Sequence, residues 1–260
     1  MIMLNKNKIK GFLIDLEGVL YNGDVLIDGS IETISFLKSK SFKIRFLTNT
    51  TTTPRKSIIK KLKKFNLPAD ISDIFSPVIA TNNFLSQKKI SKIYLLANKS
   101  LEADFNNVTF DKLSPEAVIL GDIYKEFNWD SLNTAFQLIA KNDAIIIALH
   151  KNRYCRRDGQ LGLDLGPFVQ ALEYATSKEA VLIGKPEKNF FQLALDDMEL
   201  ANDEVAMIGD DIISDIAGAK NNNILAIQVR TGKYQQSDEQ DSYVQPDLRI
   251  NSIVDLSGLL

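Results

Sequence analysis

The sequence predicts an α/β protein built on parallel sheets. Short apolar runs rich in Ile, Val and Leu alternate with amphipathic segments along nearly the whole chain. Chemically active side chains follow four of these runs. Buried strands of parallel sheets appear as near-continuous apolar runs, and helical crossovers must connect them. At 260 residues, the chain can form one large domain or two modest ones with a real core.

The composition excludes several classes of protein. Lys and Arg number 31 against 33 Asp and Glu, for a net charge of −2, so we expect no nucleic-acid partner. The basic cluster at residues 60–64 falls on the outer face of a predicted helix and is expected to be solvated. No segment is apolar enough to span a bilayer, and residues 1–10 lack the apolar core of a signal peptide. We therefore expect a cytoplasmic protein with no membrane partner.

The single cysteine and single histidine limit the chemistry further. Cys155 cannot form a disulfide within the chain, which fits a reducing cytoplasm. One cysteine and His150 cannot build a Cys/His zinc site, and no Gly-x-Ser-x-Gly motif is present. The chemistry must come from carboxylates, hydroxyls, lysine and a hard metal ion.

The first predicted strand spans residues 9–14 and ends in two carboxylates, Asp15 and Glu17, followed by Gly18. Ligands of open α/β sheets lie outside the carboxyl ends of strands. Strand alternation would aim both acids the same way, while Gly18 lets the chain turn sharply. A loop with two solvated acids is the alternative from this stretch alone.

The next elements continue the alternation of strand and helix. Residues 24–29 form a predicted turn, and Ser30 is a plausible N-cap of the helix that follows. A strand over residues 43–47 ends in Thr48 and Asn49, and Pro54 opens a second helix.

The middle of the chain predicts a second small α/β domain. Its expected elements are strands at residues 93–97, 117–120 and 144–149 and helices at residues 78–87 and 129–140. The first architecture then resumes. We therefore expect a discontinuous domain of residues 1–77 and 180–260, interrupted by an inserted domain of residues 78–179.

The returning segment adds two more strand ends with chemistry. A strand at residues 181–183 leads to Lys185, and a strand at residues 205–208 leads to Asp210 and Asp211. Asp211 is the predicted N-cap of the next helix, and Asp215, four residues on, shares its face. That helix is expected to stop at residues 221–223, before closing strands at residues 225–229 and 248–250.

The four strand ends together suit phosphoryl transfer. A carboxylate can attack phosphorus, while lysine and a cation offset the charge of the phosphate oxygens. An acid-rich pocket of oxygen donors suits Mg²⁺. Each group alone could be structural: turn residues at 48–49, a surface lysine at 185 or a capping pair at 210–211. Their occurrence together, in this order and all at strand ends, favours the shared chemical role.

This constellation resembles the haloacid dehalogenase (HAD) superfamily of phosphatases. The position of the inserted domain, between the Thr48-Asn49 strand and the Lys185 strand, resembles subfamily IIA, the NagD-like members with a C2-type cap. The stretches that carry the resemblance are Asp15-x-Glu17-Gly18-Val19-Leu20, Leu47-Thr48-Asn49, Gly184-Lys185-Pro186, Gly209-Asp210-Asp211 with Asp215, His150-Lys151-x-Arg153-Tyr154, residues 166–175 and Thr231-Gly232-Lys233-Tyr234. The implied fold is a Rossmann-like HAD core with an inserted α/β cap domain.

The resemblance also implies roles for individual residues. Asp15 would be the nucleophile, and Thr48, Asn49 and Lys185 would hold the phosphoryl oxygens. Mg²⁺ would lie between the Asp15 carboxylate, the backbone carbonyl of Glu17 and Asp210. The acids that would support this metal site are Asp211 and Asp215.

Glu17 departs from the family pattern, in which an aspartate usually protonates the leaving oxygen and then activates water. This departure concerns catalytic efficiency and leaves the nucleophile and the metal unaffected. A phosphotransferase or phosphomutase, or a phosphoryl-binding protein with weak turnover, therefore stays open as an alternative to a phosphatase of small substrates. In the inserted domain, His150, Lys151 and Arg153 are expected to recognise substrate. Because related caps often pair, a homodimer through the cap is also open.

Overall fold

The computed structural model describes the chain except for residues 1–7, 158–159, 238 and 240–243. It divides into two compact units. Unit 1 comprises Met1–Thr48, Arg55–Phe75 and Lys185–Leu260, and unit 2 comprises Asn49–Pro54 and Ser76–Gly184. A short segment after Thr48, Asn49–Pro54, belongs to unit 2.

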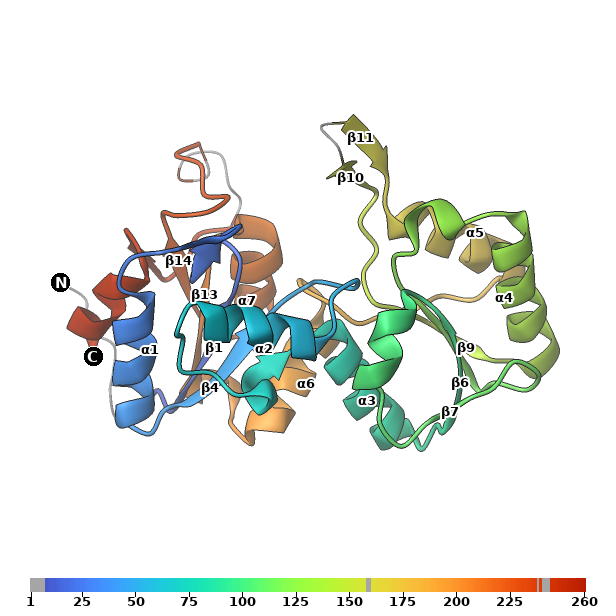
Figure 1. Cartoon of the computed structure of the whole chain (residues 1–260), viewed down its shortest axis with the longest axis horizontal. Coiled ribbons are helices and arrows are strands. Elements are labelled where there is room, and N and C mark those ends of the chain that lie inside the picture. Colours follow the sequence, from blue (N-terminus) through green and yellow to red (C-terminus); the bar gives the residue numbers. More distant parts are fainter. Residues whose placement is uncertain (1–7, 158–159, 238, 240–243) are drawn as a thin grey trace. The chain divides into compact units, whose positions relative to one another are not determined.

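Unit 1 is built on a six-stranded, fully parallel sheet (Figure 1). Its strands, in chain order, are β1 (Gly11–Asp15), β4 (Lys43–Leu47), β5 (Ile74–Phe75), β13 (Val205–Gly209), β14 (Leu225–Val229) and β15 (Leu248–Ile250). Their order across the sheet is β15-β14-β13-β1-β4-β5. β1 is central and fully buried, as its apolar run predicted. The predicted α/β class with parallel sheets is thus confirmed.

Helices cover both faces of this sheet. The helices of unit 1 are α1 (Ser30–Ser39), α2 (Arg55–Lys64), α6 (Lys188–Met198) and α7 (Gly218–Asn221), with a π-helical turn at Ile212–Ala217 and 3₁₀ turns at Ile71–Asp73, Asn202–Glu204 and Ile253–Leu259. Buried residues of α1, α2 and the last 3₁₀ turn share one apolar cluster with Phe12, Phe46 and Ile208 of the strands. Arg45 alternates with Ile44 and Phe46 along β4, so its side chain points to the other face of the sheet, where it pairs with Asp197 of α6 at 2.6 Å. The strands are therefore buried on both faces, as parallel sheets require.

Two local predictions in unit 1 need correction. Residues 24–29 are not one turn, because a short antiparallel hairpin of β2 (Tyr21–Asn22) and β3 (Val25–Leu26) occupies part of them. The N-cap of α1 is Gly29, at φ 79°, and not Ser30. The Ser30 hydroxyl donates to the carbonyl of Leu20 at 3.1 Å, so it anchors the hairpin and does not cap the helix.

Unit 2 has its own parallel sheet of five strands and a separate antiparallel hairpin. The strands of the sheet are β6 (Lys92–Leu96), β7 (Thr109–Phe110), β8 (Ala117–Leu120), β9 (Ile145–Ala148) and β12 (Val181–Leu182), in the order β12-β9-β8-β6-β7. The hairpin consists of β10 (Tyr154–Arg157) and β11 (Gln160–Leu163) and was not predicted. The helices are α3 (Pro77–Lys88), α4 (Trp129–Asn142) and α5 (Leu165–Thr176), with 3₁₀ turns at Lys99–Asp104 and Tyr124–Glu126.

The basic cluster of residues 60–64 lies on α2 with Lys60, Lys63 and Lys64 exposed, so the prediction of a solvated face is confirmed. Among the described residues, none of the helices combines the length and the apolar character needed to cross a bilayer.

Candidate active site

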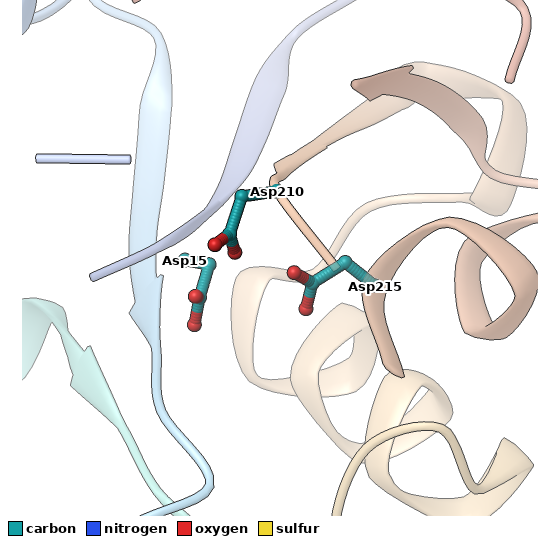
Figure 2. Close-up of side chains that lie close together, drawn as sticks. All are labelled: Asp15, Asp210 and Asp215. Carbon is teal, nitrogen blue, oxygen red and sulfur yellow. The ribbon is translucent and has the colours of Figure 1, made fainter. Parts of the chain in front are cut away.

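Three buried carboxylates meet at the carboxyl ends of β1 and β13. Asp15, Asp210 and Asp215 each offer one oxygen, and these oxygens all lie within 4.8 Å of one another. Figure 2 shows the three groups converging from the end of β1, the end of β13 and the helical turn that follows it. From β1 the chain adds β4 and β5 on one side of the sheet and later β13, β14 and β15 on the other. The cluster therefore lies where the strand order reverses, which is where open α/β sheets bind ligands.

Lys185 lies between two of these acids. Its Nζ is 2.5 Å from Oδ1 of Asp15 and 2.7 Å from Oδ1 of Asp215, and the lysine side chain is buried. Burial by itself would lower the pKa of Lys185, but the charges of Asp15 and Asp215 and their hydrogen bonds raise it above its ordinary value. Lys185 is thus a permanent buried cation facing the candidate nucleophile.

The negative charge of the cluster is only partly balanced. Burial raises the pKa of Asp210 to about 6 and that of Asp215 to about 7. Burial also raises the pKa of Asp15, although Lys185 opposes the shift. Burial thus disfavours the ionised forms of all three acids, and Lys185 is the buried ammonium among them. A further cation would stabilise the ionised cluster.

Asp211 orders the turn that carries Asp215. Its Oδ1 accepts hydrogen bonds from the backbone N–H groups of Ile213 and Ser214 at 3.0 and 2.9 Å, so the predicted N-cap is confirmed. The turn is a π-helix, because the N–H of Ile216 also donates to the carbonyl of Asp211 at 3.2 Å. The N–H of Asp211 donates to Oδ2 of Asp215 at 3.2 Å. Burial opposes ionisation of Asp211, but these hydrogen bonds and the charge of Lys233 hold its pKa below the usual range.

The side chain of Glu17 does not join the buried cluster. β1 ends at Asp15, so strand alternation does not extend to Glu17. Its side chain is exposed, and Oε1 accepts a hydrogen bond from the N–H of Gly23 at 2.5 Å. The hairpin after β1, which sequence patterns did not indicate, supplies this donor.

Gly18 must be glycine for two reasons. Its φ is +87°, a conformation that side chains strain. A Cβ at this position would also lie 2.1 Å from Oδ2 of Asp210. The chain that leaves β1 is therefore packed directly against the acid at the end of β13.

The other predicted site residues are divided between the two units. Thr48 directly follows β4 in unit 1, and its N–H donates to the carbonyl of Phe75 at 3.2 Å. Asn49 belongs to unit 2, as do Lys151 and Arg153. The residues brought together are thus Asp15, Lys185, Asp210, Asp211 and Asp215.

In unit 2, Lys151 is already engaged. Its Nζ lies 2.5 Å from Oε2 of Glu173, while Arg153 is exposed. His150 is buried; its Nδ1 accepts a hydrogen bond from the N–H of Asn152 at 3.4 Å, and its Nε2 lies 3.8 Å from Oδ1 of Asp164.

Unit 2 also has a strand-order reversal, between β6 and β8. A pocket of about 500 Å³ opens there, lined in part by Thr52, Asn98, Lys99, Asp122 and Tyr124. These residues were missed in the sequence, although Asn98 and Asp122 closely follow strands, the same signal that identified Asp15.

A second missed group approaches Asp210 from the loop after β14. The backbone N–H of Lys233 donates to Oδ2 of Asp210 at 2.6 Å, and the Lys233 ammonium lies 3.0 Å from Oδ2 of Asp211. The Thr231-Gly232-Lys233 stretch stood out only by resemblance, because a backbone donor leaves no trace in side-chain patterns.

The fold and the site together define an α/β enzyme with a Rossmann-like core and an acidic site at its switch point. Two models of haloacid dehalogenase-like hydrolases match the chain, at residues 12–111 and 182–256. The chain is 38% identical over 250 residues to haloacid dehalogenase-like hydrolase domain-containing protein 2 of Mus musculus, covering 96% of this chain and 95% of that protein. The chain belongs to the haloacid dehalogenase-like hydrolase family.

Other relatives agree with this assignment. Phospholysine phosphohistidine inorganic pyrophosphate phosphatase of Danio rerio is 36% identical over 250 residues, covering 94% of this chain and 92% of that one. Among solved structures, a 4-nitrophenylphosphatase from Thermotoga maritima has a TM-score of 0.86 at 25% identity, with 97% of both chains covered. NagD from E. coli shares the fold, with a TM-score of 0.82 at 22% identity over 95% of this chain and 98% of that one. The predicted resemblance to the haloacid dehalogenase superfamily is therefore confirmed, and NagD shares the fold of this chain.

Proposed function

We propose that this hydrolase is a Mg²⁺-dependent phosphatase that cleaves small phosphate monoesters through an aspartyl-phosphate on Asp15. The observation that carries the proposal is the buried Asp15–Lys185–Asp215 arrangement at the switch point of unit 1. The phosphatase names of the Danio rerio and Thermotoga maritima relatives support the same reaction class.

The proposed reaction has two steps. A carboxylate oxygen of Asp15 attacks phosphorus and forms an acyl phosphate while the bond from phosphorus to the leaving oxygen breaks. The leaving oxygen takes a proton from the Glu17 carboxyl group. The Glu17 carboxylate then removes a proton from water, which attacks phosphorus, releases inorganic phosphate and restores Asp15. Lys185 would offset charge on the phosphoryl oxygens throughout, and Thr48 and Asn49 would hold those oxygens through hydroxyl and amide groups.

The donor set of the cluster fits Mg²⁺. The described candidates are all oxygen donors, namely the carboxylates of Asp15 and Asp210 and the backbone carbonyl of Glu17. Burial raises the pKa values of Asp15, Asp210 and Asp215, and neighbouring carboxylates add to the shift, so a bound cation would favour their ionised forms. Asp211 and Asp215 would order the surroundings of the site. When bound, the cation would polarise a phosphoryl oxygen and screen the anionic nucleophile from the anionic substrate.

In this proposal unit 1 is the HAD core and unit 2 the C2-type cap that selects substrates. Lys151 and Arg153 are proposed recognition residues, and Lys151 would have to exchange its Glu173 partner for substrate. Within unit 2, the pocket between β6 and β8 carries hydroxyl, amide and carboxylate groups. Pairing of two chains through the cap stays a prediction, which sedimentation would test.

Two alternatives to a phosphatase use the same phosphoryl-binding site. A phosphotransferase or phosphomutase would pass the phosphoryl group of Asp15 to an alcohol or sugar phosphate in preference to water. A phosphoryl-binding protein with weak turnover is favoured by one observation, the exposed position of Glu17 and its bond to Gly23.

The test is hydrolysis of p-nitrophenyl phosphate with Mg²⁺, using Asp15→Asn as the control. We expect Mg²⁺-dependent release of p-nitrophenol and a loss of roughly 10³-fold or more in the variant. Equal rates in both proteins would refute the assignment of the nucleophile. Faster phenol release with an added alcohol, at constant phosphate release, would identify a phosphotransferase.

A further inference from the structure

The loop of residues 231–233, which follows β14, joins the ends of the two strands that flank the switch point. The hydroxyl of Thr231 donates to the backbone carbonyl of Gly18, just beyond β1, at 2.5 Å. Two residues later, the N–H of Lys233 donates to Oδ2 of Asp210, at the end of β13. One short loop thus holds both sides of the acidic cluster without contributing a carboxylate to it.

Gly232 lies between these two contacts and permits them. Its φ is +64°, and a Cβ there would lie 2.1 Å from Oδ2 of Asp210 and 2.5 Å from the Cα of Gly18. The second neighbour is backbone, which cannot move aside as the end of a flexible side chain can. The approach therefore requires glycine at residue 232.

Gly18 is held from both directions. Its N–H donates to the carbonyl of Tyr21 at 2.7 Å, and its carbonyl accepts from Thr231. The first bond orients the peptide group that joins Glu17 to Gly18, which includes the Glu17 carbonyl. The second bond anchors the other side of Gly18 to the loop of residues 231–233.

We propose that the loop of residues 231–233 positions the metal ligands, holding Asp210 and the Glu17-Gly18 backbone in the geometry that binds the cation. This inference rests on the proposed Mg²⁺ site. Because Oδ2 of Asp210 is bonded to the Lys233 N–H, the carboxylate is held in one orientation and Oδ1 is left to bind the ion. A carboxylate oriented in advance loses less conformational freedom when the cation binds, so the loop raises affinity without touching the ion.

The test measures Mg²⁺ binding by titration calorimetry in the wild type, Thr231→Val and Thr231→Ser. Valine has nearly the same shape as threonine but lacks the hydroxyl, whereas serine keeps it. We expect Thr231→Val to weaken Mg²⁺ binding by about tenfold, as loss of an outer-shell partner does, and Thr231→Ser to bind within about twofold of wild type.

The matched control is Thr33→Val. The hydroxyl of Thr33 also donates to a backbone carbonyl in unit 1, that of Ile253, at 3.4 Å, but this bond links α1 to the last 3₁₀ turn and does not involve the loop of residues 231–233. We expect this control to lose thermal stability while keeping wild-type Mg²⁺ affinity. Equal weakening by Thr33→Val and Thr231→Val would overturn the proposal, because the effect would then follow from general loosening of the unit.

A second readout separates positioning from catalysis. In Thr231→Val, the Mg²⁺ concentration for half-maximal p-nitrophenyl phosphate hydrolysis should rise about tenfold while kcat at saturating Mg²⁺ stays near wild type. Gly232→Ala should raise this concentration further, whereas Gly258→Ala, where an added Cβ meets nothing within 4 Å, should leave it unchanged. A wild-type protein that binds no Mg²⁺ would overturn the metal assignment itself. Normal binding by wild type and Thr231→Val alike would overturn only the role of the loop.

Discussion

Replacing Asp210 by asparagine should stabilise the metal-free protein at neutral pH. Burial raises the pKa of Asp210 from 3.8 to about 6. Between these values Asp210 has lost its proton in the unfolded chain and still holds it in the folded chain. The contribution of Asp210 to the free energy of unfolding therefore falls as pH rises and is constant above about pH 6. A shift of about two pH units corresponds to about 3 kcal/mol, which asparagine recovers because it has no charge to bury. The Lys233 N–H can still donate to the oxygen of the amide.

The measurement is thermal unfolding of the wild type and Asp210→Asn in a chelator, from pH 4.5 to pH 8. The expected gain in Tm at pH 8 is roughly 6–12 °C, and it should shrink towards pH 4.5. Asp28→Asn, at an exposed position of the same unit, is the matched control and should show no such pH-dependent gain. With excess Mg²⁺ the order should reverse, since only the wild type retains its ligand. A Tm gain that is absent at pH 8, or equal at both pH values, would refute the burial argument.

Three further predictions concern turnover. If the exposed side chain of Glu17 is poorly placed, Glu17→Asp should raise kcat on alkyl phosphates more than on p-nitrophenyl phosphate. General acid catalysis contributes about 10²–10⁴-fold to the rate, and poor leaving groups depend on it most. If Glu17→Ala hydrolysed alkyl phosphates as fast as the wild type, Glu17 would have no role in the mechanism. Mg²⁺ should support activity and Ca²⁺ inhibit it, because Ca²⁺ takes more oxygens in a looser geometry; steady-state rates with each ion check this, and equal activation by both would contradict it. Lys151→Ala and Arg153→Ala should change the ranking of a panel of phosphate esters but leave calorimetric Mg²⁺ affinity unchanged, and an unaltered ranking would argue against cap recognition.

The sequence alone determined the main strands and helices and the candidate chemistry of this protein. The strands predicted at residues 43–47, 117–120 and 225–229 match β4, β8 and β14 residue for residue. Burial on both faces of a parallel sheet leaves a continuous apolar run at residues 117–120, whereas Lys43 and Arg45 interrupt the run of β4. The capping role of Asp211 also followed from local spacing, since an N-cap depends only on neighbouring backbone donors.

Only the tertiary structure decided which of these groups meet. Lys185 lies 170 residues from Asp15 in the chain, and their contact depends on the order of strands in the sheet, which local patterns do not encode. The hairpin after β1 supplies the N–H of Gly23, which bonds the side chain of Glu17 at an exposed position. Strand alternation had instead predicted that Glu17 would point the same way as Asp15. The approach of Gly232 to Asp210 was equally hidden, because it depends on backbone packing between segments distant in sequence. The sequence therefore specified the reacting groups, and the long-range packing of backbone and strands determined their geometry.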